Sequence, residues 1–101
     1  MEKPMADTIR TERRDGIVLL RLRCQTFDAS AAASLIEALR RSERLPLLVD
    51  FSAVRDFDDH SVARFCAAAR AHAGPIRFHG LREHQVRMLR YLGLDPARAR
   101  A

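Results

Sequence analysis

The sequence has no tryptophan, one tyrosine and five phenylalanines, so aromatic residues make up only 6% of its 101 residues. Nucleic-acid-binding domains stack bases on exposed aromatic side chains, and this chain contains few of them. No apolar run approaches the roughly 18 residues that a membrane-spanning helix needs. Residues 1–14 are polar and lack the apolar core of a signal peptide. We therefore expect a cytoplasmic protein.

Cysteine is scarce as well. Cys24 and Cys66 lie far apart and form neither a Cys-x-x-Cys pair nor half of a zinc-binding pattern. None of the four histidines stands at a metal-ligand spacing from another. The sequence also lacks a glycine-rich phosphate-binding loop and a nucleophile elbow. It therefore predicts two buried thiols, no metal, no cofactor and no catalytic site.

Length and composition are those of one globular domain. Hydrophobic residues make up 48% of the chain and charged residues 31%, which excludes a disordered or fibrous protein. A chain of 101 residues suffices for one domain and not for two. We expect a single domain over residues 1–101, with frayed ends at about residues 1–6 and 97–101.

Turn and helix signals predict the order of the elements. Asp15-Gly16 is a turn dipeptide between residues 8–13 and 17–22, and it predicts an opening β-hairpin. Apolar spacing and breaker residues then predict a helix from Asp28 or Ser30 to about Glu43, a strand at 47–51, a helix at 59–73, a strand at 76–79 and a helix at 80–92. This order indicates an α/β domain. We expect a mixed four-stranded sheet, an antiparallel hairpin followed by parallel strands, packed with about three helices.

One stretch of the sequence carries a family resemblance. Residues 48–63 read L-V-D-F-S-A-V-R-D-F-D-D-H-S-V-A. This stretch is similar, without gaps, to the pattern V-L-D-L-S-G-V-x-x-I-D-S-S-G-L-G of the STAS domain family, the fold of bacterial anti-sigma-factor antagonists. Phe27-Asp28-Ala29, Gly80-Leu81 and residues 92–95 resemble further family positions, so the resemblance extends from about residue 16 to residue 95. It implies a STAS-like fold and a non-enzymatic regulatory module that binds another protein.

The chain departs from the family pattern at the phosphorylation site. The resemblance implies that a partner kinase phosphorylates the second serine of D-S-S-G, and His60 stands at that position. Asp58 keeps the family's aspartate, Asp59 replaces the first serine, and Ser61 and Ala63 replace the two glycines. Ser61 lies one residue further on, about 100° around a helix from the expected direction. We therefore expect no switching by serine phosphorylation.

The two aspartates at the start of this helix have two interpretations. Asp58 and Asp59 are good capping residues for a helix N-terminus and for its partial positive charge. Alternatively, they form a permanently acidic surface that imitates a phosphorylated state. The capping interpretation is favoured, and the sequence leaves both open.

The helix predicted over residues 59–73 has two different faces at 100° per residue. The apolar face, expected to lie against the sheet, consists of Val62, Phe65, Cys66, Ala69 and Ala73. The opposite face has two long polar residues followed by methyl groups only: His60, Arg64, Ala67 and Ala71. It is either a docking surface for a partner or the solvated face of an alanine-rich helix, and the resemblance implies the former. The predicted partner-binding residues are Asp58, Asp59, His60, Ser61, Arg64, Ala67 and Ala71.

The net charge of +5 is concentrated in the C-terminal part of the chain. Residues 61–101 contain eight arginines and two acidic residues, and Arg87 and Arg90 share one edge of the helix predicted over residues 80–92. A solvated cationic face is the favoured interpretation. An acidic protein partner and a nucleic acid are the alternatives.

Three functions follow from these observations. By resemblance, the partner is a serine-kinase-type anti-sigma factor or a related switch protein. The same resemblance implies an alternative, the small STAS subunit of a lipid-trafficking ABC transporter, which binds its ATPase subunit through this same helix. Asp59 departs from the threonine expected in that subunit. The third is a basic nucleic-acid-binding domain.

Overall fold

The computed structural model describes residues 8–42 and 44–96. The ends expected to fray, at about residues 1–6 and 97–101, lie outside the described residues. The described elements are, in chain order, β1 (Ile9–Arg14), β2 (Ile17–Leu22), β3 (Thr26–Phe27), α1 (Ala29–Ser42), β4 (Leu47–Asp50), β5 (Asp56–Phe57), α2 (Asp59–Ala71), β6 (Ile76–His79) and α3 (Glu83–Tyr91).

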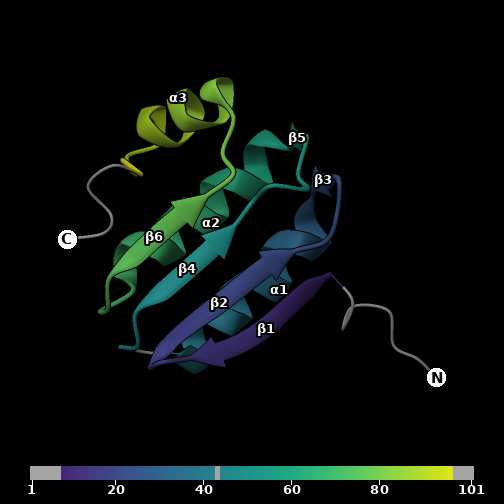
Figure 1. The fold of residues 1–101 in the computed structure, drawn as a ribbon. Coiled ribbons are helices and arrows are strands. Elements are labelled where there is room, and N and C mark those ends of the chain that lie inside the picture. Colours follow the sequence, from purple (N-terminus) through teal and green to yellow (C-terminus); the bar gives the residue numbers. More distant parts are fainter. Residues whose placement is uncertain (1–7, 43, 97–101) are drawn as a thin grey trace.

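The main sheet has four strands in the order β1-β2-β4-β6 (Figure 1). Strands β1 and β2 are antiparallel, and β4 lies parallel to both β2 and β6. With three helices in the described residues, this confirms the predicted α/β architecture of an opening hairpin followed by parallel strands.

The hairpin turn forms where the sequence predicts it. Asp15 and Gly16 both have positive φ, 54° and 79°, as a two-residue hairpin turn requires. The register places Arg14 opposite Ile17 and Ile9 opposite Leu22. The alternation along β2 buries Val18, Leu20 and Leu22 on one face of the sheet.

Helices α1 and α2 lie side by side against one face of the sheet (Figure 1). Leu20 and Val49 from the sheet, Leu35 from α1 and Phe65 from α2 are all 0% exposed and form the centre of the core. All five phenylalanines belong to one cluster in which neighbouring ring centroids are 5.7 to 6.2 Å apart. Aromatic pairs at this spacing stabilise a core beyond the area they bury.

Helix α3 lies beyond the carboxyl end of β6 (Figure 1). Its anchors are Leu89 and Gln85, both 0% exposed. Gln85 Nε2 donates to the Val54 carbonyl at 3.1 Å, and Gln85 Oε1 accepts from the Arg82 backbone N–H at 2.8 Å. The buried amide is therefore bonded on both sides, which satisfies the requirement that buried polar groups have partners.

The structure corrects two predicted helix boundaries and adds a pair of short strands. Helix α2 ends at Ala71 because His72 adopts an extended conformation, with ψ 132°, so Ala73 is exposed and not part of the buried face. Helix α3 begins at Glu83 and not at Gly80, which has a φ of 80° and approaches Ser52 so closely that a Cβ there would overlap it. The two-residue strands β3 and β5, which pair in parallel, had no sequence signal.

Candidate partner-binding surface on α2

The start of α2 is fixed by a compact hydrogen-bonded cap. Asp58 is the N-cap residue, with φ −87° and ψ 122°. Its Oδ2 accepts from the Ser61 backbone N–H at 3.0 Å and from the Ser61 hydroxyl at 2.6 Å. A side-chain oxygen that accepts from the third helical N–H is the usual way to satisfy a helix N-terminus. The family-like aspartate therefore has a structural role here.

The cap sets the charge of Asp58. The hydrogen bonds that the Ser61 side chain and backbone donate lower the pKa of Asp58, with a smaller contribution from the nearby His60. Asp58 is accordingly an anion at neutral pH, and Asp59 adds a second acidic side chain in the first turn. Both side chains are exposed. The beginning of α2 thus presents an acidic rim to solvent.

Beyond this rim, one face of α2 points to solvent along its whole length. His60, Arg64, Ala67 and Ala71, called here the α2 stripe, are all exposed. Their spacing of four, three and four residues keeps them on one side of a helix. Val62, Phe65, Cys66 and Ala69, on the other side, are between 0% and 5% exposed. The structure therefore places the predicted exposed and buried faces as the sequence indicates, apart from Ala73.

Ser61 requires a correction. The family pattern predicts it as a partner-binding residue, but Ser61 is 0% exposed and its hydroxyl donates to Asp58. It lies four residues before Phe65, so it belongs to the side of the helix that packs on the sheet. Six of the seven predicted residues share the surface; Ser61 lies beneath it and supports it.

Aspartate and serine at the end of β4 also have a structural role. Asp50 is 8% exposed; its Oδ1 accepts from the Ser52 backbone N–H at 2.9 Å and from the Ser52 hydroxyl, and its Oδ2 accepts from Arg21 Nε at 3.2 Å. Partial burial raises the pKa of Asp50, but these bonds outweigh it and leave the pKa below its usual value. The D-F-S part of the motif therefore holds the loop that leads toward α2.

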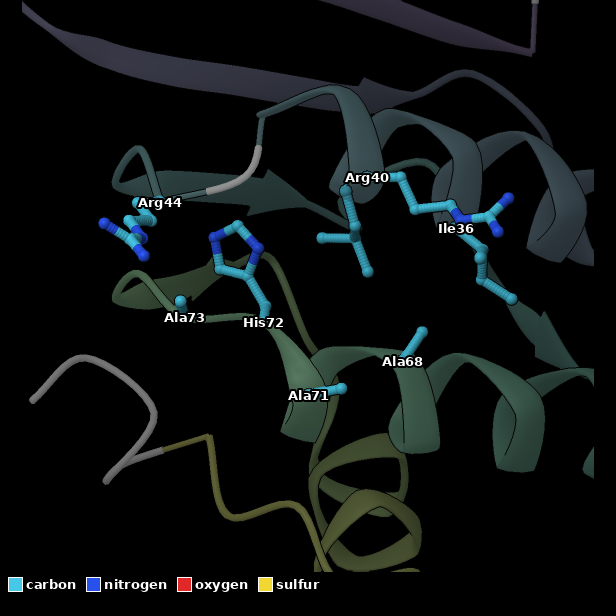
Figure 2. Close-up of a pocket in the computed structure, with 8 residues that line it drawn as sticks. Ile36, Arg40, Arg44, Ala68, Ala71, His72 and Ala73 are labelled. Carbon is cyan, nitrogen blue, oxygen red and sulfur yellow. The ribbon is translucent and has the colours of Figure 1, made fainter.

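Sequence reasoning missed a groove between α1 and α2, near the C-terminal ends of both helices (Figure 2). This α1–α2 groove has a volume of about 370 Å³ and is lined by Ile36, Leu39, Arg40, Arg44, Ala68, Ala71, His72 and Ala73. Ala71 belongs to both the groove and the α2 stripe. The one available signal in the sequence is the group of arginines at and after the end of the first predicted helix, Arg40, Arg41 and Arg44.

Burial shifts the pKa of both cysteine thiols. Burial raises the pKa of the Cys66 thiol to about 11, so it is protonated at neutral pH and a poor nucleophile. Cys24, predicted to be buried as well, is only half-buried, and this burial still raises its pKa. Within residues 8–42 and 44–96, no three His, Cys, Asp or Glu side chains gather in a way that could hold a metal ion. No helix in the same residues is long and apolar enough to cross a membrane.

A comparison with protein families agrees with the geometry. A family model described as "Mlab, STAS domain" matches residues 25–97, which include every element from β3 to α3. A search of curated proteins found no match. The matched region contains the cap at Asp58, the α2 stripe and the loop held by Asp50. Since the match covers well over half of the sequence, the chain belongs to the STAS domain family.

Proposed function

We propose that this chain is a non-enzymatic regulatory module that binds another protein through the start of α2 and the α2 stripe. The observation that supports this most is the division of α2 into two faces. The side chains of one face are at most 5% exposed, and the other face exposes an arginine, a histidine and two alanines in a row. Membership of a family whose domains typically mediate protein–protein interactions supports the same role.

The chemistry of the stripe suits a protein partner. Ala67 and Ala71 have only methyl side chains, so a partner backbone or helix can approach the axis of α2 closely. His60 and Arg64 lie at the other end and provide hydrogen-bond donors. Arginine is enriched at the energetic centres of interfaces, because its guanidinium group makes several directed bonds. The alanine end of the stripe would then provide close packing, and the end with His60 and Arg64 would provide the directed hydrogen bonds that select the partner.

We propose further that serine phosphorylation does not switch this surface. His60 stands where the family resemblance places the phosphate acceptor. The neighbouring hydroxyl of Ser61 is buried and hydrogen-bonded to Asp58, and the adjacent carboxylates of Asp58 and Asp59 would repel an incoming phosphate. The surface is therefore a constant one, formed whenever the domain is folded.

The family resemblance supplies two candidate partners. The first is a serine-kinase-type anti-sigma factor, or a related switch protein. The second is the ATPase subunit of a lipid-trafficking ABC transporter; the matching family model is described by the name Mlab and not as an anti-sigma-factor antagonist, which favours this second candidate. Both candidates belong to the bacterial cytoplasm, the compartment expected from the sequence. The proteins encoded by the neighbouring genes, a kinase-like protein or an ATPase, would identify which candidate to test.

A nucleic acid is a weaker candidate. Five of the six aromatic side chains form the core cluster, and only Tyr91, on α3, is an exposed aromatic side chain. A single ring does not make a stacking platform. The arginines of α3 could still contact phosphates, but such contacts weaken steeply with salt and do not specify a sequence.

The test measures the affinity of the purified chain for the kinase-like or ATPase protein encoded beside it. Arg64→Glu should weaken binding by about 100-fold, since a reversed charge within an interface costs several kcal/mol. The matched control is Arg77→Glu, which makes the same charge change on an exposed residue of β6. It should change the affinity less than about threefold. Equal losses of affinity for the two variants would mean that the α2 stripe is not part of the interface.

A further inference from the structure

The α1–α2 groove combines an apolar floor with cationic side chains. Ile36 comes from α1, and Ala68 and Ala71 come from α2 (Figure 2). Leu39 of α1 also lines the groove and is 3% exposed. The α2 side contributes only methyl groups, so a space remains that a larger side chain would fill. The floor suits an aliphatic group.

The charged side chains that line the groove are all basic. They are Arg40 and Arg44; His72 also lines the groove, and within residues 8–42 and 44–96 no acidic residue lines it. Arg40 lies 3.6 Å from Glu37, but Glu37 also pairs with Arg41 at 3.3 Å. One carboxylate is thus shared between two arginines, and a net positive charge remains beside the apolar floor. Such an edge is complementary to a carboxylate.

The dipoles of the helices explain only part of this arrangement. Basic residues at the C-terminal end of a helix interact favourably with its partial negative charge, which accounts for the position of Arg40 in the last turn of α1. The dipole does not account for an unfilled apolar floor beneath these cations, nor for Arg44, which lies beyond the end of the helix.

The end of the groove is held in place by contacts between two loops. The Leu45 carbonyl accepts a hydrogen bond from His72 Nε2 at 3.2 Å. Two residues further on, Gly74 lies so close to the Arg44 and Leu45 backbone that a Cβ would overlap it. Figure 2 shows His72 and Arg44 at the same end of the groove. This end is therefore formed before any partner arrives, which lowers the entropy cost of binding.

We propose that the α1–α2 groove binds a segment of the protein partner in which an aliphatic side chain lies next to carboxylates. The aliphatic side chain occupies the floor, and the carboxylates pair with Arg40, Arg44 and His72. This rests on the proposed function, because Ala71 joins the groove to the α2 stripe and one partner can cover both. A segment laid between two helices is an established mode of peptide recognition.

The experiment is an NMR titration of the ¹⁵N-labelled full chain with short synthetic peptides. The probe is acetyl-Glu-Leu-Leu-Glu-Asp-amide. Two matched peptides serve as controls: acetyl-Lys-Leu-Leu-Lys-Lys-amide reverses the charge, and acetyl-Glu-Ser-Ser-Glu-Asp-amide removes the aliphatic groups. We expect saturable shifts of the Ala68, Ala71, His72 and Arg44 amides with the probe, and at least about tenfold weaker binding of either control.

Variants of the chain test the same contacts from the other side. Arg40→Ala with Arg44→Ala should weaken probe binding at least about tenfold, whereas Arg55→Ala with Arg77→Ala, an equal charge change on exposed residues outside the groove, should leave it within about twofold. Ala68→Leu fills the floor without changing the charge and should also abolish the shifts. The thermal unfolding curve of each variant verifies that it is folded.

Several results would overturn the proposal. The first is no saturable shift with the probe, and the second is equal binding of the lysine peptide. The third is a set of shifts with octanoate but not with the probe, and the fourth is a set of groove shifts that depend on protein concentration alone. The last two would assign the groove to a small anion or to a second copy of the chain. If the probe fails while Arg64→Glu still weakens partner binding, the groove proposal is wrong and the proposed function stands.

Discussion

The polar groups around the two ends of α2 are arranged differently. At the N-terminal end, Asp58 and Ser61 are bonded to each other and the hydroxyl is buried. At the C-terminal end, the chain turns away at His72, and Arg40 and Arg44 border an apolar groove. The end that most resembles the family's regulatory motif is thus internally satisfied. The end without a motif borders the α1–α2 groove, the proposed site for a partner segment.

The difference follows from the helix termini and from their surroundings. The first N–H groups of a helix need acceptors, so polar side chains at that end form hydrogen bonds with them. At the other end, α1 and α2 finish close together, and small residues on α2 leave space between them. Resemblance of a motif therefore points to α2 as the proposed binding helix, whereas hydrogen bonding and burial decide which of its groups can meet a partner.

The largest effect on stability is expected at the buried face of α2, on which both ends of the helix depend. Phe65 is 0% exposed and touches three other phenylalanine rings. Phe65→Ala should lower the free energy of unfolding by about 3 to 5 kcal/mol, because it leaves a cavity in the core. Its neighbour on the exposed face, Arg64→Ala, should change that free energy by less than about 0.5 kcal/mol. Urea unfolding of both variants measures this.

The opposite ranking of these two variants would mean that α2 is rotated about its axis. The α2 stripe would then face the sheet, and the comparison between the two ends would lose its basis.

A smaller effect is expected at the C-terminal end. Gly74→Ala places a Cβ against the backbone of Arg44 and Leu45, so the two loops that close the groove must separate. We expect a loss of about 1 to 3 kcal/mol in the free energy of unfolding, the usual cost of overpacking. Ala73→Ser, at the exposed neighbouring position, is the control. A Gly74→Ala protein as stable as the parent would show that the end of the groove is not rigid.

The smallest effect is expected at the N-terminal end, and it depends on pH. Hydrogen bonds from Ser61 lower the pKa of Asp58 in the folded protein below its unfolded value of about 3.9. Ionised Asp58 therefore favours folding above about pH 4, and this contribution is lost as the pH falls through the folded-state pKa. Asp58→Asn should be less stable than the parent at pH 7, and the difference should disappear in acid.

The measurement is the free energy of unfolding of the parent and of Asp58→Asn between pH 7 and pH 2.5. A difference that grows as the pH falls would mean that the cap does not bind the ionised carboxylate.

Local signals made most of the fold predictable. The Asp15-Gly16 dipeptide determines the hairpin, and helical spacing alone separates Phe65 from Arg64. The same spacing places Ser61 on the buried side, four residues before Phe65, but the family motif drew attention to its hydroxyl instead. The groove could not be predicted, because it depends on how closely two helices distant in sequence pack. The β3–β5 pair was missed because two residues per strand leave no detectable alternation.

The most direct test of the central claim, a constant binding surface on α2, is the affinity of the chain for the partner encoded beside it, measured before and after the chain is incubated with ATP and a serine kinase encoded nearby. Mass spectrometry of the same samples locates any phosphate. We predict a dissociation constant unchanged within about twofold, which is under 0.5 kcal/mol, and no phosphate on Ser61 or His60. Stoichiometric phosphate at either residue, together with a large change in affinity, would contradict it.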